Sequence, residues 1–235
     1  MKYKRILLKL SGEGLMGDKS FGLDENKLFS IAEEIKTVHK KGLQIALVIG
    51  GGNIFRGLSG AAKGMDRVSG DHMGMLATVI NSLAMQDALN RVGVPARVVS
   101  GVTMPTICES YIHRKAKSNL ESGDVVIFAA GTGNPYFTTE TGAALRAAEM
   151  QCGAILKATQ VDGVYTADPK KDKNAVRLEK VSYDEVLTKN LKVMDATAIA
   201  LAKENSIAII VFSMHEKGAL ERVLDEKGAF TCISD

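Results

Sequence analysis

The sequence predicts an α/β fold, a three-layer αβα sandwich in which helices cover both faces of an open, mostly parallel sheet. Apolar runs of strand length alternate with helical patterns along all 235 residues, as in chains built from β-α-β units. The runs are apolar at consecutive positions, as in strands that are buried on both faces. Because no low-complexity linker or internal repeat interrupts the alternation, we expect a single domain over residues 1–235.

Six apolar runs are the expected strands, and four segments between them are the expected helices. The strands are 5–10, 43–49, 96–100, 124–130, 153–159 and 207–212. The helices are 24–41, 72–91, 141–150 and 196–205. In the first helix, apolar residues recur every three or four positions, between Asp24 as a candidate N-cap and Gly42 as the terminator. Met73, Leu76, Ile80 and Leu83 recur in the same way in the second. The longest break in periodicity, residues 161–175, is expected to be a loop.

Composition excludes several classes of protein. The net charge is only +3, the basic residues are interspersed with acidic ones, and Trp is absent, so we expect no nucleic-acid partner. No stretch is apolar over the length of a membrane span, and the N-terminus lacks the features of a signal peptide. The three cysteines are far apart, without a CxxC or Cys/His cluster, so we expect no structural metal site in a reduced, cytoplasmic protein.

Three glycine-bearing segments follow predicted strands, at residues 9–14, 50–53 and 131–140. Ligands of open α/β sheets lie outside the carboxyl ends of the strands, where backbone N–H groups and helix N-termini bind anions. A single turn of this kind often contains glycine for geometry alone, but three at one edge favour an anion site. The dinucleotide pattern GxGxxG fails at Phe55 and Tyr136, and no GxxxxGK[ST] is present.

Charged residues near these turns are the candidate ligand contacts. Lys9 lies near the end of an apolar strand, where a buried ammonium needs an anionic partner unless it reaches water. Arg56 follows the triple glycine and is either a bidentate phosphate ligand or a solvated loop residue. Asp71 either caps the helix over 72–91 or accepts hydrogen bonds from sugar hydroxyls. His72 has no apparent catalytic partner and is interpreted as structural.

Six stretches together resemble the bacterial UMP kinases, or uridylate kinases, of the amino acid kinase superfamily. They are KRILLKLSGE, VIGGGNIFRG, RVSGDHMGMLATVINSLAMQDAL, AAGTGNPYFTTE, LKATQVDGVYTADPKKD and LKVMDATA. The resemblance runs from about residue 3 to the C-terminus, and GDHMGMLAT and GTGNPYFTT are its most specific parts. It implies a largely parallel sheet of about eight strands. It also implies transfer of the γ-phosphoryl group of ATP to UMP, giving UDP in pyrimidine biosynthesis.

The resemblance also implies the site residues, with UMP bound by the N-terminal part and ATP by the part from about residue 153. The ATP residues are Lys9, Leu10, Ser11, Gly12, Gly52, Arg56, Thr159, Tyr165 and Asp168. The UMP residues are Gly51, Asp71, Thr132, Gly133, Asn134, Pro135, Tyr136, Phe137, Thr138 and Thr139. Lys9 and Arg56 are the expected catalytic residues. Mg²⁺ is expected to be carried by the phosphates of ATP, without a metal site in the chain.

Regulation and assembly are implied in the same way. Gly17, Asp18, Lys19, Ser20, Phe21 and Gly22 match a segment linked in some members to activation by GTP. UTP is a feedback inhibitor of family members, which commonly form hexamers. The chain departs from the family pattern at Glu140, where an Asp is usual, so the organising role of that Asp is open here. Asp195 matches another acidic position whose role is open.

The expected mechanism requires no general base, because the accepting phosphate oxygen of UMP is already ionised at neutral pH. Catalysis would consist of positioning and charge stabilisation, and Gly50 to Gly52 would let backbone N–H groups reach the phosphates. Two alternatives remain. A kinase of the same fold that phosphorylates a carboxylate should lack the GDHMGM and GTGNPYFTT segments. A non-catalytic nucleotide-binding relative would have less need of Lys9 and Arg56.

Overall fold

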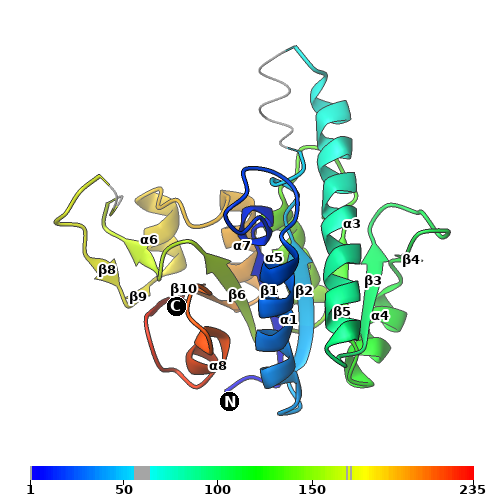
Figure 1. Ribbon diagram of the computed structural model, residues 1–235. Coiled ribbons are helices and arrows are strands. Elements are labelled where there is room, and N and C mark those ends of the chain that lie inside the picture. The colour runs from blue at the N-terminus through cyan, green and yellow to red at the C-terminus, as the bar shows by residue number, and fades with distance from the viewer. Residues whose placement is uncertain (1, 56–63, 168, 170) are drawn as a thin grey trace.

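The computed structural model describes residues 2–55, 64–167, 169 and 171–235 (Figure 1). In this part of the chain the main sheet has nine strands in the order β4-β3-β5-β2-β1-β6-β10-β11-β9, and β7 and β8 form a separate two-stranded sheet. Every neighbouring pair in the main sheet is parallel except β10 and β11. The predicted mostly parallel sheet is confirmed, with one strand more than the resemblance implies.

The strands are β1 (Arg5–Leu10), β2 (Gln44–Ile49), β3 (Ala96–Ser100), β4 (Glu109–Ser110), β5 (Val125–Ala129), β6 (Ala154–Thr159), β7 (Val164–Tyr165), β8 (Arg177–Leu178), β9 (Lys180–Val181), β10 (Ala208–Ser213) and β11 (Phe230–Ile233). The helices are α1 (Glu25–His39), α3 (Arg67–Arg91), α4 (His113–Glu121), α5 (Thr139–Glu149), α6 (Tyr183–Thr188), α7 (Ala196–Glu204) and α8 (Ala219–Leu224), with a 3₁₀ turn η1 (Gly12–Leu15). No helix among the described residues combines the length and the apolar character needed to cross a membrane.

The six predicted strands are confirmed to within one residue at each end. The prediction failed mainly for short elements, since α4, α6, α8 and the two-residue strands lack an apolar run of useful length. The expected loop over 161–175 in fact contains β7, which pairs with β8 to form a hairpin. Helix α3 begins five residues earlier than predicted, because Asp66 is its N-cap and accepts a hydrogen bond from the backbone N–H of Ser69.

Two hydrophobic cores lie on the two faces of the sheet, and the alternation along β1 shows how they are separated. Ile6, Leu8 and Leu10 belong to the core that contains α1, α3 and α8. Leu7 belongs to the opposite core, which contains α4, α5, α6 and α7. In Figure 1, α1 and α8 lie in front of the sheet and α5 and α7 behind it. The three-layer αβα arrangement is therefore confirmed, and Lys9 points to the same side as Leu7, toward α5.

Helix α3 packs on the sheet with a different face from the one that its apolar periodicity marks. Met73, Leu76 and Ile80 are 43, 52 and 48% exposed. The face toward the sheet instead carries the buried Met75, Val79, Met85 and Leu89. Because the helix is apolar on two faces, periodicity predicts the helix correctly but does not determine which face is buried.

Strand β1 lies at the centre of the sheet, and later strands of the chain are added on both sides of it. The next strand, β2, pairs with one edge of β1, whereas β6 pairs with the other edge after α5 has crossed the sheet. A reversal of this kind creates a crevice outside the carboxyl ends of the strands, where ligands of open α/β sheets bind. The three glycine-bearing segments follow β1, β2 and β5, which are consecutive neighbours, so their predicted meeting at one edge is confirmed.

Candidate active site

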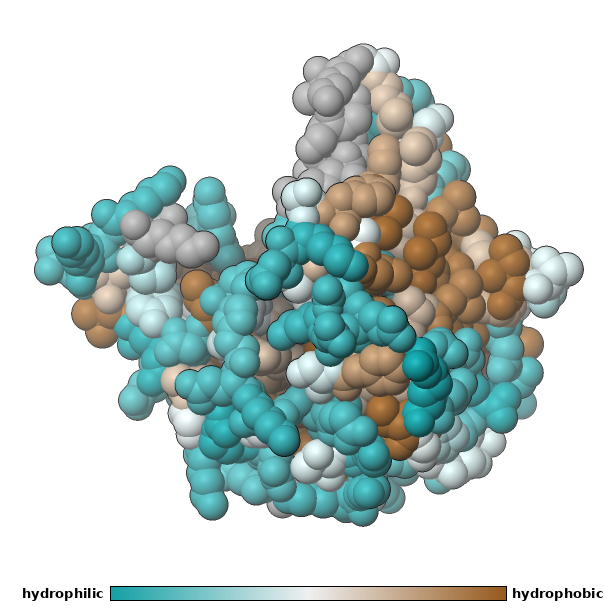
Figure 2. Space-filling view, in the orientation of Figure 1, coloured by the Kyte–Doolittle hydropathy of each residue, from teal (hydrophilic) through white to brown (hydrophobic). Residues whose placement is uncertain are grey.

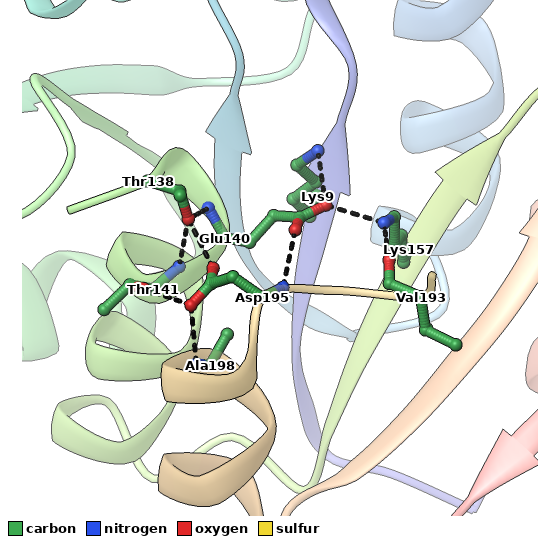
Figure 3. A network of polar contacts seen from close by, with 8 residues as sticks. All are labelled: Lys9, Thr138, Glu140, Thr141, Lys157, Val193, Asp195 and Ala198. Atoms are coloured by element: carbon green, nitrogen blue, oxygen red, sulfur yellow. Dashed lines mark hydrogen bonds and ion pairs between the residues drawn. The ribbon is translucent and has the colours of Figure 1, made fainter. Parts of the chain in front are cut away.

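Two lysines and one glutamate meet at the carboxyl ends of β1 and β6 (Figure 3). Lys9 and Lys157 are paired residues of the two neighbouring strands. Glu140 Oε1, in the first turn of α5, lies 3.6 Å from Lys9 Nζ and 2.6 Å from Lys157 Nζ. Lys157 also donates to the carbonyl of Val193. Two ammonium groups thus share one carboxylate, which leaves one positive charge unbalanced within the cluster.

Burial makes this imbalance unfavourable. The side chain of Lys9 is only 9% exposed. The pKa of Lys9 is lowered from its usual range, chiefly because burial removes the ammonium from water; the Glu140 carboxylate opposes this shift and the Lys157 ammonium adds to it. An anion that contacts both lysines would balance the charge and stabilise the protonated form of Lys9. The cluster therefore has the electrostatics of an anion site.

Asp195 holds the carboxylate of this cluster in place. Its Oδ2 accepts from Thr138 Oγ1 at 2.5 Å, and its Oδ1 accepts from Thr141 Oγ1 at 2.9 Å. The same Oδ1 caps α7 by accepting from the backbone N–H of Ala198. The backbone N–H of Asp195 donates to Glu140 Oε2 at 3.1 Å. Asp195 therefore joins the N-termini of α5 and α7 and fixes the glutamate that faces both lysines (Figure 3). This structural role, and the contact of Glu140 with both lysines, were open in the sequence.

A cavity of about 780 Å³ opens beside the lysine pair, within the volume range of small-molecule sites. The residues that line it include Lys9, Ser11, Lys157, Thr159 and Tyr165. All of these except Lys157 were predicted to bind ATP, so the structure brings four predicted residues together around one cavity. Its other walls are the β6–β7 connection, the β7 strand and the segment 189–193. Two further predicted ATP residues, Arg56 and Asp168, lie outside the described residues.

The glycine turn after β2 is tightly packed by protein atoms. A Cβ on Gly51 would lie 2.8 Å from Ala77 Cβ and 2.9 Å from the Gly74 carbonyl, both in α3. A Cβ on Gly12 would lie 2.5 Å from the carbonyl of Gly50. Glycine is therefore required at both positions by the close approach of chain segments. At Gly51 it is α3 that excludes a side chain, a reason that the sequence did not reveal.

A buried pair of asparagines fixes this turn. Asn81 Nδ2, in α3, donates to the Gly50 carbonyl at 2.6 Å and to Asn53 Oδ1 at 2.7 Å. Asn53 Nδ2 donates in turn to the carbonyl of Gly22 at 2.8 Å. Asn81 is fully buried and Asn53 is 2% exposed, so the loss of either amide would leave buried polar groups unpaired. The predicted regulatory segment 17–22 is thereby attached, through Gly22, to the turn after β2.

Asp71 contacts the predicted UMP segment. Its Oδ2 lies 2.8 Å from Arg67 Nε and accepts from the backbone N–H of Tyr136 at 2.7 Å. Since Asp66 is the cap and Asp71 lies inside α3, the capping alternative for Asp71 is wrong. Tyr136 has a φ of 72° and is 67% exposed. A non-glycine residue held at positive φ costs roughly 1–3 kcal/mol, and such strain concentrates at functional sites.

The remaining predicted positions lie at the same edge of the sheet. Leu10 ends β1, and Gly52 lies in the turn after β2. The segment from Thr132 to Thr138 connects β5 to α5, which begins at Thr139. Thr138 caps α5 by accepting from the backbone N–H groups of Glu140 and Thr141. A Cβ on Gly133 would lie 2.6 Å from the Gly101 carbonyl, so glycine is required there also.

A family model described as "Amino acid kinase family" matches residues 4–213. The chain belongs to the amino acid kinase family. It is 57% identical over 234 residues to "Uridylate kinase" of Paramagnetospirillum magneticum, covering 100% of this chain and 98% of that protein. It is 58% identical to "Uridylate kinase" of Hyphomonas neptunium, covering 100% and 93%. The resemblance on which the predictions rest is therefore confirmed at the level of the family.

Solved structures of this amino acid kinase family agree with the fold. A UMP kinase from Ureaplasma parvum superposes with a TM-score of 0.94 at 42% identity, covering all of both chains. A UMP kinase from Bacillus anthracis superposes with a TM-score of 0.96 at 38% identity, covering 100% of this chain and 97% of that one. The αβα architecture is thus shared across the whole length of the chain.

The shared carboxylate leads to a prediction for the pKa of Lys9. In Glu140→Gln only burial and the Lys157 ammonium act strongly on Lys9, and both lower its pKa, so we expect a pKa below that of the unmodified protein. Glu140→Asp keeps the charge and serves as the control, with a smaller decrease. The pKa is read from a pH titration of the lysine side-chain ¹³Cε signals, with Lys9→Arg to assign the resonance. An unchanged pKa in Glu140→Gln would show that Glu140 does not hold Lys9 in its charged form.

Proposed function

We propose that the protein transfers the γ-phosphoryl group of ATP to UMP, giving ADP and UDP, as a step of pyrimidine nucleotide synthesis. The observation that carries the proposal is the Lys9–Lys157 pair, which shares one carboxylate and lines a cavity large enough for a nucleotide. The names of the relatives, uridylate kinases at 57 and 58% identity over the whole chain, supply the acceptor.

ATP is assigned to the cavity and to the part of the chain from about residue 153. Its adenosine would lie against Thr159 and Tyr165, and its phosphates would extend toward Lys9, Ser11 and Lys157. This orientation is supported by charge, because two ammonium groups share one carboxylate in the lining of the cavity and the triphosphate is the anionic part of ATP. Leu10, Gly12, Gly52, Arg56 and Asp168 remain the further proposed ATP contacts.

UMP is assigned to the N-terminal part, between Gly51, Asp71 and the segment 132–139. The carboxylate of Asp71 already accepts a backbone N–H from this segment, so a ribose that bonded to Asp71 would lie beside the segment. Strand β2, which leads into one half of this site, is the neighbour of β1 and its Lys9, and β5, which leads into the other half, lies next to β2. The accepting phosphate would thus lie near the lysine pair.

Transfer needs one bond to form and one to break. A phosphate oxygen of UMP bonds to the γ-phosphorus as the bond to the bridging oxygen of ADP breaks, and no proton has to be removed from the acceptor. Lys9 and Lys157 would stabilise the negative charge on the transferred group, and Glu140 and Asp195 would hold them in position. The residues of the site would therefore act by positioning the two substrates and by stabilising charge.

Mg²⁺ is proposed to enter with ATP, where it would neutralise part of the phosphate charge. Across the described ranges no group of three or more His, Cys, Asp and Glu side chains is placed to hold a metal ion. The nearest carboxylate to the lysine pair, Glu140, is occupied by two ammonium groups and a backbone N–H. The proposed metal would therefore take its ligands mainly from phosphates and water.

We also propose that the chain forms a homo-oligomer, with a hexamer as the expected state. The exposed stripe of Met73, Leu76 and Ile80 along α3 supports this, because contiguous exposed apolar surface marks sites of protein contact. Figure 2 shows hydrophobic residues gathered over α3 at the right of the molecule. A light-scattering mass equal to one chain would refute the proposal.

Regulation by GTP and UTP is a further proposal, resting on the match of residues 17–22. The two hydrogen bonds between Gly22 and Asn53 give this segment a direct attachment to the turn after β2, which packs against Gly12. A GTP titration that leaves activity unchanged at several UTP concentrations would refute it.

We also propose that the enzyme is cytoplasmic. The thiols of Cys108, Cys152 and Cys232 form no disulfide, as is usual in a reducing compartment.

A panel of acceptors tests the proposed reaction directly. We expect ADP release from ATP with UMP, and much less with CMP, glutamate or aspartate. Lys9→Ala is expected to lower kcat about 10²–10³-fold with little change in UMP affinity, by analogy with the loss of one preorganised charge-stabilising contact. A coupled ADP-release assay measures both. Preference for glutamate or aspartate would favour a carboxylate kinase, and no turnover with any acceptor would favour a nucleotide-binding protein without this activity.

The ribose contact is tested by Asp71→Asn. If the carboxylate accepts from ribose hydroxyls, dUMP leaves part of a desolvated acceptor unpaired, at a cost of about 1–3 kcal/mol. The unmodified enzyme should therefore prefer UMP over dUMP by roughly 5- to 150-fold in kcat/KM. In Asp71→Asn we expect a higher KM for UMP and a smaller ratio, measured by steady-state kinetics. Asp66→Asn, at the true cap of α3, is the control and should keep the ratio. A preserved ratio in folded Asp71→Asn would contradict the ribose role.

A further inference from the structure

The β7–β8 hairpin forms one wall of the cavity but has little stability of its own. Among the described residues its ladder has two pairs, Val164 with Leu178 and Tyr165 with Arg177. Residues 163–167, which include β7, line the cavity. Because an isolated two-stranded ladder is marginally stable at best, the position of this wall depends on the part of the protein to which the hairpin is attached.

The buried hydroxyl of Thr231 contacts both strands of the hairpin and connects them to the main sheet. Thr231, in β11, is fully buried. Its Oγ1 accepts from the backbone N–H of Val164 at 2.8 Å and donates to the carbonyl of Leu178 at 2.5 Å. Val164 and Leu178 are directly opposite each other in the ladder. The hydroxyl therefore uses both its donor and its acceptor capacity to bridge the two strands.

A glycine beside this hydroxyl leaves the room that the hydroxyl occupies. A Cβ on Gly163 would lie 2.6 Å from Thr231 Oγ1 and 2.9 Å from Arg177 Cδ, so no larger residue fits beside the hydroxyl. Arg177 adds a second attachment to β11, because its Nη1 donates to the carbonyl of Phe230 at 2.7 Å. In the main sheet Thr231 pairs with Val211, which also lines the cavity. Strand β11 thus holds the hairpin that forms this wall of the cavity.

We propose that Thr231 is a positioning residue for the phosphoryl donor, acting through the hairpin that its hydroxyl holds against the nucleotide cavity. Thr231 is separated from the cavity by Gly163 and Val164, so it contributes to the geometry of the donor site rather than to the reacting atoms. The inference rests on the proposed function in one respect, namely that ATP occupies this cavity. It assigns to β11, near the end of the chain, a part in donor affinity.

Steady-state kinetics of two substitutions test the proposal. Thr231→Val keeps the shape of the side chain but removes both hydrogen bonds, and we expect KM for ATP to rise about 5- to 10-fold. The values of kcat at saturating ATP and of KM for UMP should stay within about twofold. This is the pattern expected when a mutation weakens ATP binding equally in the ground state and in the transition state. Thr231→Ser keeps the hydroxyl and should restore KM for ATP to near that of the unmodified enzyme.

Tyr183→Phe is the matched control for general loosening of this half of the protein. Tyr183 is buried and its hydroxyl donates to the carbonyl of Ile207 at 2.6 Å, so the variant loses a buried hydrogen bond of the same kind without touching the hairpin. It should keep KM for ATP. An unchanged KM for ATP in folded Thr231→Val, or an equal rise in Tyr183→Phe or Thr231→Ser, would overturn the proposal.

Amide hydrogen exchange tests the same inference without turnover, so failure of the proposed reaction can be told apart from failure of the positioning role. Removing the acceptor of the Val164 N–H should speed the exchange of that amide in Thr231→Val but not in Tyr183→Phe. Exchange at the unmodified rate in Thr231→Val would show that the hydroxyl does not hold the hairpin, whatever reaction the enzyme catalyses.

Discussion

Two ammonium groups with one carboxylate between them, at a place where Lys9 is buried, are the constraint on which the site depends. Lys9 and Lys157 are paired across β1 and β6, so the sheet itself fixes their separation, and Glu140 reaches both from α5. In a buried setting, the unbalanced charge costs stability in the absence of an anion and favours binding when one is present. The same feature that destabilises the unliganded chain thus prepares it to bind phosphate.

The surrounding fold serves to keep this arrangement in place. Asp195 joins α5 to α7 and so fixes the carboxylate. On the other side of β1, the Asn81 amide holds the turn after β2 through the carbonyl of Gly50, while Thr231 holds the hairpin that walls the cavity. Each contact comes from an element distant in sequence. The site is therefore assembled by polar side chains that connect segments distant in sequence.

The sequence predicted the long elements and the edge of the sheet that holds the site, because buried parallel strands leave continuous apolar runs. It missed Lys157, although a lysine near the end of the run 153–159 repeats the pattern of Lys9 in 5–10, and this repetition was a usable signal. The packing reason for Gly51 and the role of Thr231 were not predictable, since both depend on contacts between segments that only the folded chain brings together. For the same reason the periodicity of α3 did not show that Met73, Leu76 and Ile80 are exposed.

The most direct test of the central account is the thermal stabilisation of Lys157→Met by ATP, compared with its stabilisation by adenosine. The substitution keeps an unbranched apolar stem and leaves Lys9 with Glu140 as a neutral pair. In the unmodified protein the account predicts a much larger rise in Tm with ATP than with adenosine, and a ligand at 100 times its Kd adds about 2.7 kcal/mol. In Lys157→Met the rise in Tm with adenosine should persist, while most of the additional rise that ATP gives over adenosine should disappear. If ATP gave the same additional rise in Tm in the variant as in the unmodified protein, the claim that the unbalanced ammonium pair binds the phosphates would be contradicted.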